Sequence, residues 1–212
     1  MVRLGHLLGN QAGRHMLSKS KQRGVTLIEL MVAVVIVSIL FVIAAPSYRG
    51  WIQNQQIRTA AESILNGIQL ARSESVKNNS RARFVLCGLP ASSWEILAVS
   101  APGGVPAAAP AASLACGAGS NAAAGEVRVQ ERSGQEGSRL ATVAVLPNAA
   151  TTVTFNSFGR VVGNADGSAP LTQFDVSTPT GDRPLRITLG AGGNTRMCDP
   201  SPLLAATDPR HC

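Results

Sequence analysis

The stretch KQRGVTLIELMVAVVIVSILFVIAAPSY, residues 21–48, determines how the rest of the chain is interpreted. From Leu30 to Tyr48 it contains 19 residues without a charge, most of them Val, Ile, Leu, Met, Phe or Ala. At 1.5 Å per residue a helix of this length extends roughly 28 Å, close to the thickness of the hydrocarbon layer of a bilayer. We therefore expect a membrane-spanning helix, with residues 25–48 as the membrane half of a longer helix.

The charge distribution orients this helix. The sequence has 19 Lys and Arg against 12 Asp and Glu, for a formal charge of +7, and residues 1–24 contain five basic residues and no acid. Basic residues concentrate on the cytoplasmic side of membrane helices, so the chain beyond Arg49 is predicted to lie on the side of the membrane away from the cytoplasm. The remaining 14 basic and 12 acidic residues give only +2, which does not indicate a general affinity for nucleic acid.

A cleaved secretory signal is the alternative for this N-terminus. Pro46 follows Ala44-Ala45, where a signal cleavage site would end, and Glu29 lies at the start of the apolar run. A carboxylate beside a membrane segment is energetically costly and usually has a functional partner. Both residues argue against a simple secretory signal.

Residues 21–33, KQRGVTLIELMVA, resemble the N-terminal signature of type IV pilins and of the pseudopilins of type II secretion. The resemblance implies that a prepilin peptidase cuts between Gly24 and Val25 and methylates the new N-terminus, although Phe is more common than Val after the cut. It also implies that Glu29 pairs with the N-terminal amine of a neighbouring subunit and sets the register of a filament. An ordinary helix-terminal acid, favoured by the macrodipole, is the alternative for Glu29.

The resemblance makes residues 1–24 a leader peptide. Met16 offers a second translation start that would leave a leader of residues 16–24, and the sequence leaves Met1 and Met16 both open. Pro46 matches a helix-kinking proline of the same superfamily.

An amphipathic helix is predicted to follow the membrane half, over residues 49–79. Apolar residues recur there at helical spacing, which is typical of a helix packed on a globular head. The stripe consists of Ile57, Ala61, Ile64, Ile68 and Ala71. The whole helix is expected to run from Val25 to about Lys77, with its bend at Pro46.

Residues 80–212 are predicted to form a mainly antiparallel β head, which makes the fold class α+β and pilin-like. With 15% charged residues, 21 Gly and 12 Pro, the composition favours strands and loops over an all-helical enzyme. Residues 101–125 are rich in Ala and Gly and read as a low-complexity loop. The expected strands are 81–87, 94–100, 126–131, 140–146, 151–155, 173–177 and 184–189.

The order of helix and strands, with Phe155, Phe158 and Gly159 in the middle of the head, is similar to the GspH/FimT family of minor pilins and minor pseudopilins. Gly159 can adopt positive φ in a turn, and we expect structural roles for all three residues.

Four cysteines in a periplasmic head indicate disulfides, because the periplasm oxidises thiols. Three connectivities exist, and the short closures favour Cys87 with Cys116 and Cys198 with Cys212. The second loop, of about 15 residues, contributes roughly 3 kcal/mol by chain entropy. A metal site at Cys198, Cys212 and His211 ranks below the disulfide, since no Cys-x-x-Cys pair is present. We expect no metal, no cofactor and no enzymatic activity.

The tail 198–212 looks like the C-terminus of the FimT branch, in which arginines before the first cysteine are associated with DNA binding. Here Arg196 is retained and Asn194 replaces the other arginine. Arg183, Arg186 and Arg210 complete the candidate cluster. Solvated pairing of these arginines with the nearby Asp182, Asp199 and Asp208 is the alternative.

Three functions are therefore predicted for a protein held by one helix in the bacterial inner membrane. The first is a minor structural subunit of a type IV pilus, assembled with other pilins. The second is a minor pseudopilin of the type II secretion system. The third is a DNA-binding pilin for natural transformation.

Overall fold

A computed structural model describes residues 24–104, 116, 121–205 and 207–212, and for residues 44–46 it describes only the backbone. The predicted leader and most of the Ala- and Gly-rich segment lie outside the described residues. The chain divides into two compact units, Met1–Ile43 and Ala44–Cys212, which we name the N-terminal unit and the head unit. Each unit is described by itself.

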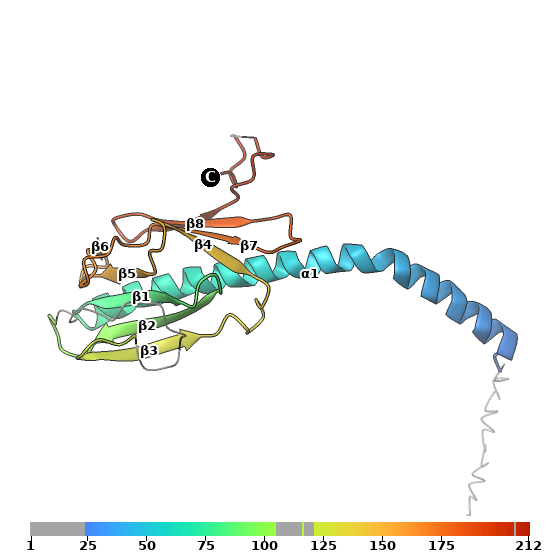
Figure 1. The fold of residues 1–212 in the computed structure, drawn as a ribbon, viewed down its shortest axis with the longest axis horizontal. Coiled ribbons are helices and arrows are strands. Elements are labelled where there is room, and N and C mark those ends of the chain that lie inside the picture. The colour runs from blue at the N-terminus through green and yellow to red at the C-terminus, as the bar shows by residue number, and fades with distance from the viewer. Residues whose placement is uncertain (1–23, 105–115, 117–120, 206) are drawn as a thin grey trace, which may run out of the picture. The chain divides into compact units, whose positions relative to one another are not determined.

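One helix, α1, extends over Leu27–Lys77 (Figure 1). Its bounds agree with the predicted helix to within two residues. The helix ends where Asn79 adopts a left-handed conformation (φ 45°), which lets the backbone N–H of Ser80 return to the carbonyl of Ser75. For membrane crossing, α1 is considered as two parts, Leu27–Ile43 and Ser47–Lys77. In the described part of the chain no single helix is long and apolar enough to cross a membrane, but these two parts together fit a span by length and composition alone.

The predicted apolar stripe of α1 is the helix side of the core. Its five members, Ile57, Ala61, Ile64, Ile68 and Ala71, are all fully buried. Gly67 lies on the same side, and a Cβ there would come within 2.8 Å of Phe84 Cε2. The glycine therefore allows α1 to approach the sheet closely at this point.

Two antiparallel sheets pack against α1 within the head unit (Figure 1). The first has the order β3-β2-β1-β5-β6 and the second the order β4-β7-β8-β9. Both contribute to one core, in which Phe84 and Phe174 meet edge to face with ring centroids 6.0 Å apart. The strands are β1 (Ala82–Cys87), β2 (Ser93–Val99), β3 (Glu126–Arg132), β4 (Thr142–Leu146), β5 (Thr152–Phe155), β6 (Val161–Val162), β7 (Gln173–Ser177), β8 (Leu185–Leu189) and β9 (Thr195–Cys198).

The α+β architecture and the seven predicted strands agree with the structure, and β6 and β9 are additional. β9 follows the tight turn of residues 190–194, where Gly193 has φ +79°. The expectation of a structural role for Phe158 is wrong for its side chain, which is 80% exposed, whereas Phe155 is fully buried. Gly159 has φ +70°, as a turn glycine should.

Candidate functional site

The N-terminal motif lies at the beginning of α1. Gly24, Val25 and Thr26 precede the helix, and Thr26 Oγ1 accepts a hydrogen bond from the backbone N–H of Glu29 at 3.3 Å. Thr at the N-cap with Glu three residues later is the pattern of a capping box. The motif therefore starts the helix, and it does so through the backbone of Glu29 rather than through its carboxylate.

Nothing in the described part of the chain requires residue 24 to be glycine. A Cβ at this position would meet no described atom within 4 Å, and its φ is not left-handed. Glycine is required in a fold where a side chain would clash or where φ is positive, and neither condition holds here. The described part of the fold therefore gives no reason for glycine at this position.

The carboxylate of Glu29 is exposed and belongs to a largely apolar surface. Within the described residues no cation lies at ion-pair distance from it. Its neighbours Leu27 and Ile28 are 79% and 71% exposed, and Val42 at the far end of the segment is 76% exposed. So much apolar helix surface needs lipid or other helices to cover it.

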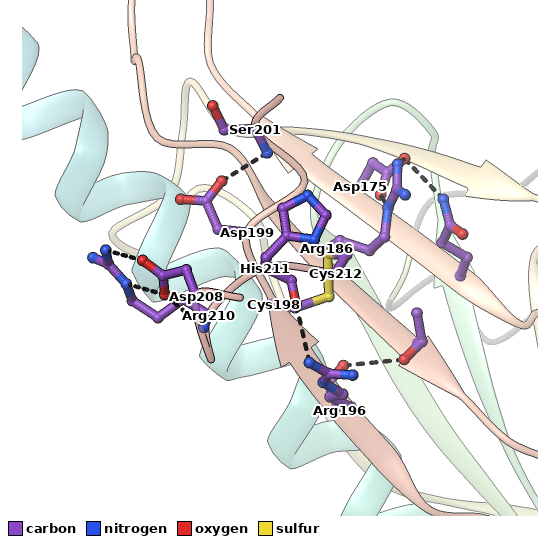
Figure 2. The surroundings of a disulfide bond; sticks show 12 residues. Asp175, Arg186, Arg196, Cys198, Asp199, Ser201, Asp208, Arg210, His211 and Cys212 are labelled. Atoms are coloured by element: carbon purple, nitrogen blue, oxygen red, sulfur yellow. Dashed lines mark hydrogen bonds and ion pairs between the residues drawn. A yellow bond between two sulfur atoms is a disulfide. The ribbon is translucent and has the colours of Figure 1, made fainter. Parts of the chain in front are cut away.

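Both disulfides have the pairing that the short loop closures favour. Cys87 Sγ is bonded to Cys116 Sγ, and Cys198 Sγ to Cys212 Sγ. The second disulfide fixes the tail 198–212 beside β9 (Figure 2). The backbones of Asp199 and His211 form an isolated parallel β-bridge there. Because the two sulfurs are bonded to each other, Cys198 and Cys212 do not provide the two thiolates of the alternative metal site. In the described ranges no group of three His, Cys, Asp or Glu side chains is placed to hold a metal ion.

A buried ion pair holds the end of the Ala- and Gly-rich segment, and sequence reasoning did not find it. Arg83 on β1 and Glu126 on β3 are 4% and 1% exposed in their side chains, and Arg83 Nε donates to Glu126 Oε1 at 2.7 Å. Arg83 also donates to the carbonyl of Asn121. A buried charge needs such partners, so removing either one would leave the other uncompensated.

The four candidate arginines fall into two pairs rather than one cluster. Arg186 on β8 and Arg196 on β9 share the outer face of the second sheet, diagonally across the β8–β9 register. Arg183 and Arg210 instead line a groove on the helix side of the head unit. Arg186 and Arg196 therefore share one surface, and Arg183 and Arg210 line another.

Three of these arginines already have partners within the chain (Figure 2). Arg186 Nε donates to Asp175 Oδ1 at 2.6 Å, and this bond raises the pKa of the guanidinium. Arg196 Nη2 donates to the carbonyl of His211 at 2.9 Å.

Arg210 and Asp208 form a bidentate pair, and the Arg210 hydrogen bonds lower the pKa of Asp208 to about 2. The alternative to DNA binding was that the candidate arginines pair with nearby aspartates. Arg210 does so with Asp208. Arg186 also pairs with an aspartate, but with Asp175, which the sequence had not suggested.

The groove has a volume of about 960 Å³ and runs between the first turns of α1 in the head unit and the tail. The turn between β7 and β8 closes one side, because Asn54 Nδ2 donates to Asp182 Oδ1 at 2.7 Å. Trp51, Arg58, Leu185 and Met197 are among the lining residues, so the groove carries both apolar and charged groups. Arg58 is paired with Glu62 at 2.7 Å.

These features define a class of protein. Residues 19–45 match the prokaryotic N-terminal methylation motif, which places the chain among the type IV pilin-like proteins. Residues 60–193, well over half of the chain, match the family described as type II transport protein GspH. The chain belongs to the GspH family, and it is a minor pilin or pseudopilin.

Solved structures of a minor pilin show a weak overall likeness. The type IV minor pilin FimU of Pseudomonas aeruginosa, in two crystal forms, is 18% and 17% identical in sequence, with TM-scores of 0.44 and 0.43. Each match covers 66% of this chain and 87% or 90% of FimU. A search of curated proteins found no match.

Proposed function

We propose that this protein is a minor subunit of a type IV pilus, held in the inner membrane by residues 25–48 before it joins the filament. The exposed apolar surface of Leu27–Ile43 carries this proposal. In a helix that begins with a processing motif, such a surface suits lipid first and the apolar helices of other subunits later. Residues 49–79 and 80–212 then form the periplasmic part.

Processing is the first step in this account. A prepilin peptidase removes residues 1–24 by cutting between Gly24 and Val25, and Val25 becomes a methylated N-terminus. The open surroundings of Gly24 support this step, since the fold itself does not require glycine there.

Glu29 acts in assembly. When subunits pack their apolar helices together, its carboxylate enters a region of low dielectric and needs a positive partner. The N-terminal amine of a neighbouring Val25 provides one, because Glu29 has no cation of its own among the described residues. The pair fixes the axial register between subunits.

The test is a comparison of two glutamates on the same helix. Glu29→Ala should leave membrane insertion and head folding unchanged but reduce the amount of subunit in sheared filaments. Glu62→Ala is the matched control, because Glu62 is an exposed helix acid whose partner is Arg58 in the same chain. If both variants reach filaments at the wild-type level, Glu29 does not pair between subunits.

A role in type II secretion is the second candidate, and the family match favours it by its description. Deleting the gene separates the two. Loss of surface pili with normal protein secretion supports the pilus subunit, and the reverse supports the pseudopilin. In either case the protein is proposed to be structural and to lack catalytic activity.

DNA binding in natural transformation stays a prediction. Arg186 and Arg196 share one face, which supports a small contact surface for phosphates. The separation of Arg183 and Arg210 from that face, and the pairing of Arg186 with Asp175, limit its strength.

A further inference from the structure

Two aromatic side chains stand exposed and stacked near the start of the head unit. Tyr48 and Trp51 are 61% and 58% exposed, with ring centroids 6.0 Å apart and ring planes 25° from parallel. By contrast, Trp94 and Phe84 in the core are only 3% and 0% exposed. The exposed pair is therefore not part of the head's hydrophobic core.

The place of the pair in the sequence suggests what covers it. Tyr48 ends the uncharged run that begins at Leu30, and Arg49 is the first charged residue after it. A helix over this run is about as long as the hydrocarbon layer is thick. Tyr48 and Trp51 then fall at the outer end of that layer, within one helical turn of each other.

Tyr and Trp are suited to this level of a membrane. Each has an apolar ring and one polar atom, and both residues are enriched where hydrocarbon meets the headgroups. The exposed Arg49 between them has the charge that lipid phosphates attract.

We propose that Tyr48 and Trp51 form an interfacial anchor, with their rings in the headgroup layer on the periplasmic side of the inner membrane before assembly. This inference rests on the proposed membrane insertion of residues 25–48.

The anchor also sets the height of the head above the lipid. The turn between β7 and β8 is bonded to α1 just past Trp51, where Thr180 N–H donates to Gln53 Oε1 at 3.0 Å and Asp182 N–H donates to Asn54 Oδ1 at 3.2 Å. No spacer separates the anchor from the head. The groove that Trp51 lines would therefore open at the bilayer surface.

Trp51 provides its own probe, because the sequence has only two tryptophans. The full processed protein is reconstituted at low density in liposomes whose lipids carry bromine either near the glycerol or at the chain ends. The fluorescence of Trp51 is obtained as the difference between the wild type and Trp51→Phe. Trp94→Phe gives the same signal directly if that variant folds.

The anchor predicts that bromine near the glycerol quenches Trp51 more strongly than bromine at the chain ends. Trp94 in the Trp51→Phe variant should be insensitive to both, since it is buried and donates to Ser63 Oγ at 2.8 Å. Absence of quenching, or stronger quenching from the chain ends, in protein that floats with the liposomes would overturn the anchor while leaving membrane insertion intact. If the protein does not float with the liposomes, the proposed membrane insertion fails as well.

Discussion

Cys198, at the end of the edge strand β9, is bonded to Cys212, and this bond holds the tail beside the second sheet. The backbone reinforces it, because Asp199 N–H donates to the carbonyl of Arg210 at 2.7 Å and Cys212 N–H donates to the carbonyl of Asp199 at 3.2 Å. The tail has little buried apolar surface of its own, so the covalent bond is its main constraint.

Replacing both cysteines of the tail, Cys198→Ser with Cys212→Ser, should lower the free energy of unfolding by up to about 3 kcal/mol. It should also expose residues 199–211 to protease. Chemical denaturation and limited proteolysis of the purified protein in detergent measure the two effects. The pair Cys87→Ser with Cys116→Ser is the control and should leave the tail protected; tail cleavage at the wild-type rate in the first variant would contradict this role.

Asp208 should titrate unusually low. Its pKa is lowered from 3.8 to about 2 by hydrogen bonds from Arg210. A carboxylate with a lowered pKa in the folded state stabilises that state above its unfolded pKa, and the contribution is lost as pH falls towards 2. An NMR titration of the Asp208 carboxyl carbon should show the pKa rising towards the ordinary range in Arg210→Gln, although the backbone N–H of residue 210 still donates to the carboxylate. An unchanged low value would mean that the Arg210 side chain is not its partner.

Phe155 and Phe158 lie three residues apart in opposite environments. Phe155→Ala should destabilise the head by roughly 3–5 kcal/mol, because it leaves a cavity in the core. Phe158→Ala should change stability by less than about 0.5 kcal/mol, as expected for an exposed site. Thermal melting of both variants tests the assignment, and a large loss for Phe158→Ala would show that its ring is buried in solution.

The helix was predictable because its periodicity is a local property. Ile57, Ile64 and Ile68 recur at the helical spacing, and all three are buried as the spacing requires. The membrane run is likewise evident from the absence of charge between Leu30 and Tyr48. Strands with clear β-branched runs and flanking turns were equally accessible.

Features that depend on tertiary pairing were not predictable. β9 is only four residues long, and Met197 is its one apolar residue besides the cysteine. Its sequence alone does not indicate a strand, and its pairing with β8 defines it. Asp175 lies 11 residues before Arg186, and the two meet only because they are directly opposite in the β7–β8 register. Sequence proximity placed the four arginines in one cluster, whereas strand alternation and the fold of the tail separate them. The alternating Thr195, Arg196 and Met197 after a glycine turn was the one local signal for β9.

The salt dependence of DNA affinity measures how many of the four arginines contact phosphates. Log affinity falls with log salt at roughly −0.9 per neutralised phosphate on duplex DNA. Two arginines on one face predict a slope no steeper than about −2 for the purified protein, and Arg196→Ala should lower it by about one. A slope near −4 would show that all four arginines contact one DNA molecule, rather than only the two on the outer face of the second sheet.

The intact mass of the protein extracted from membranes tests the central claim most directly, because every role proposed above begins with cleavage after Gly24. In cells with an active prepilin peptidase, the account predicts a chain of residues 25–212 that carries one additional methyl group at Val25 and two disulfides. Gly24→Val should accumulate the uncleaved chain. A wild-type protein that retains residues 21–24, or that is cut after Ala45, would contradict the account.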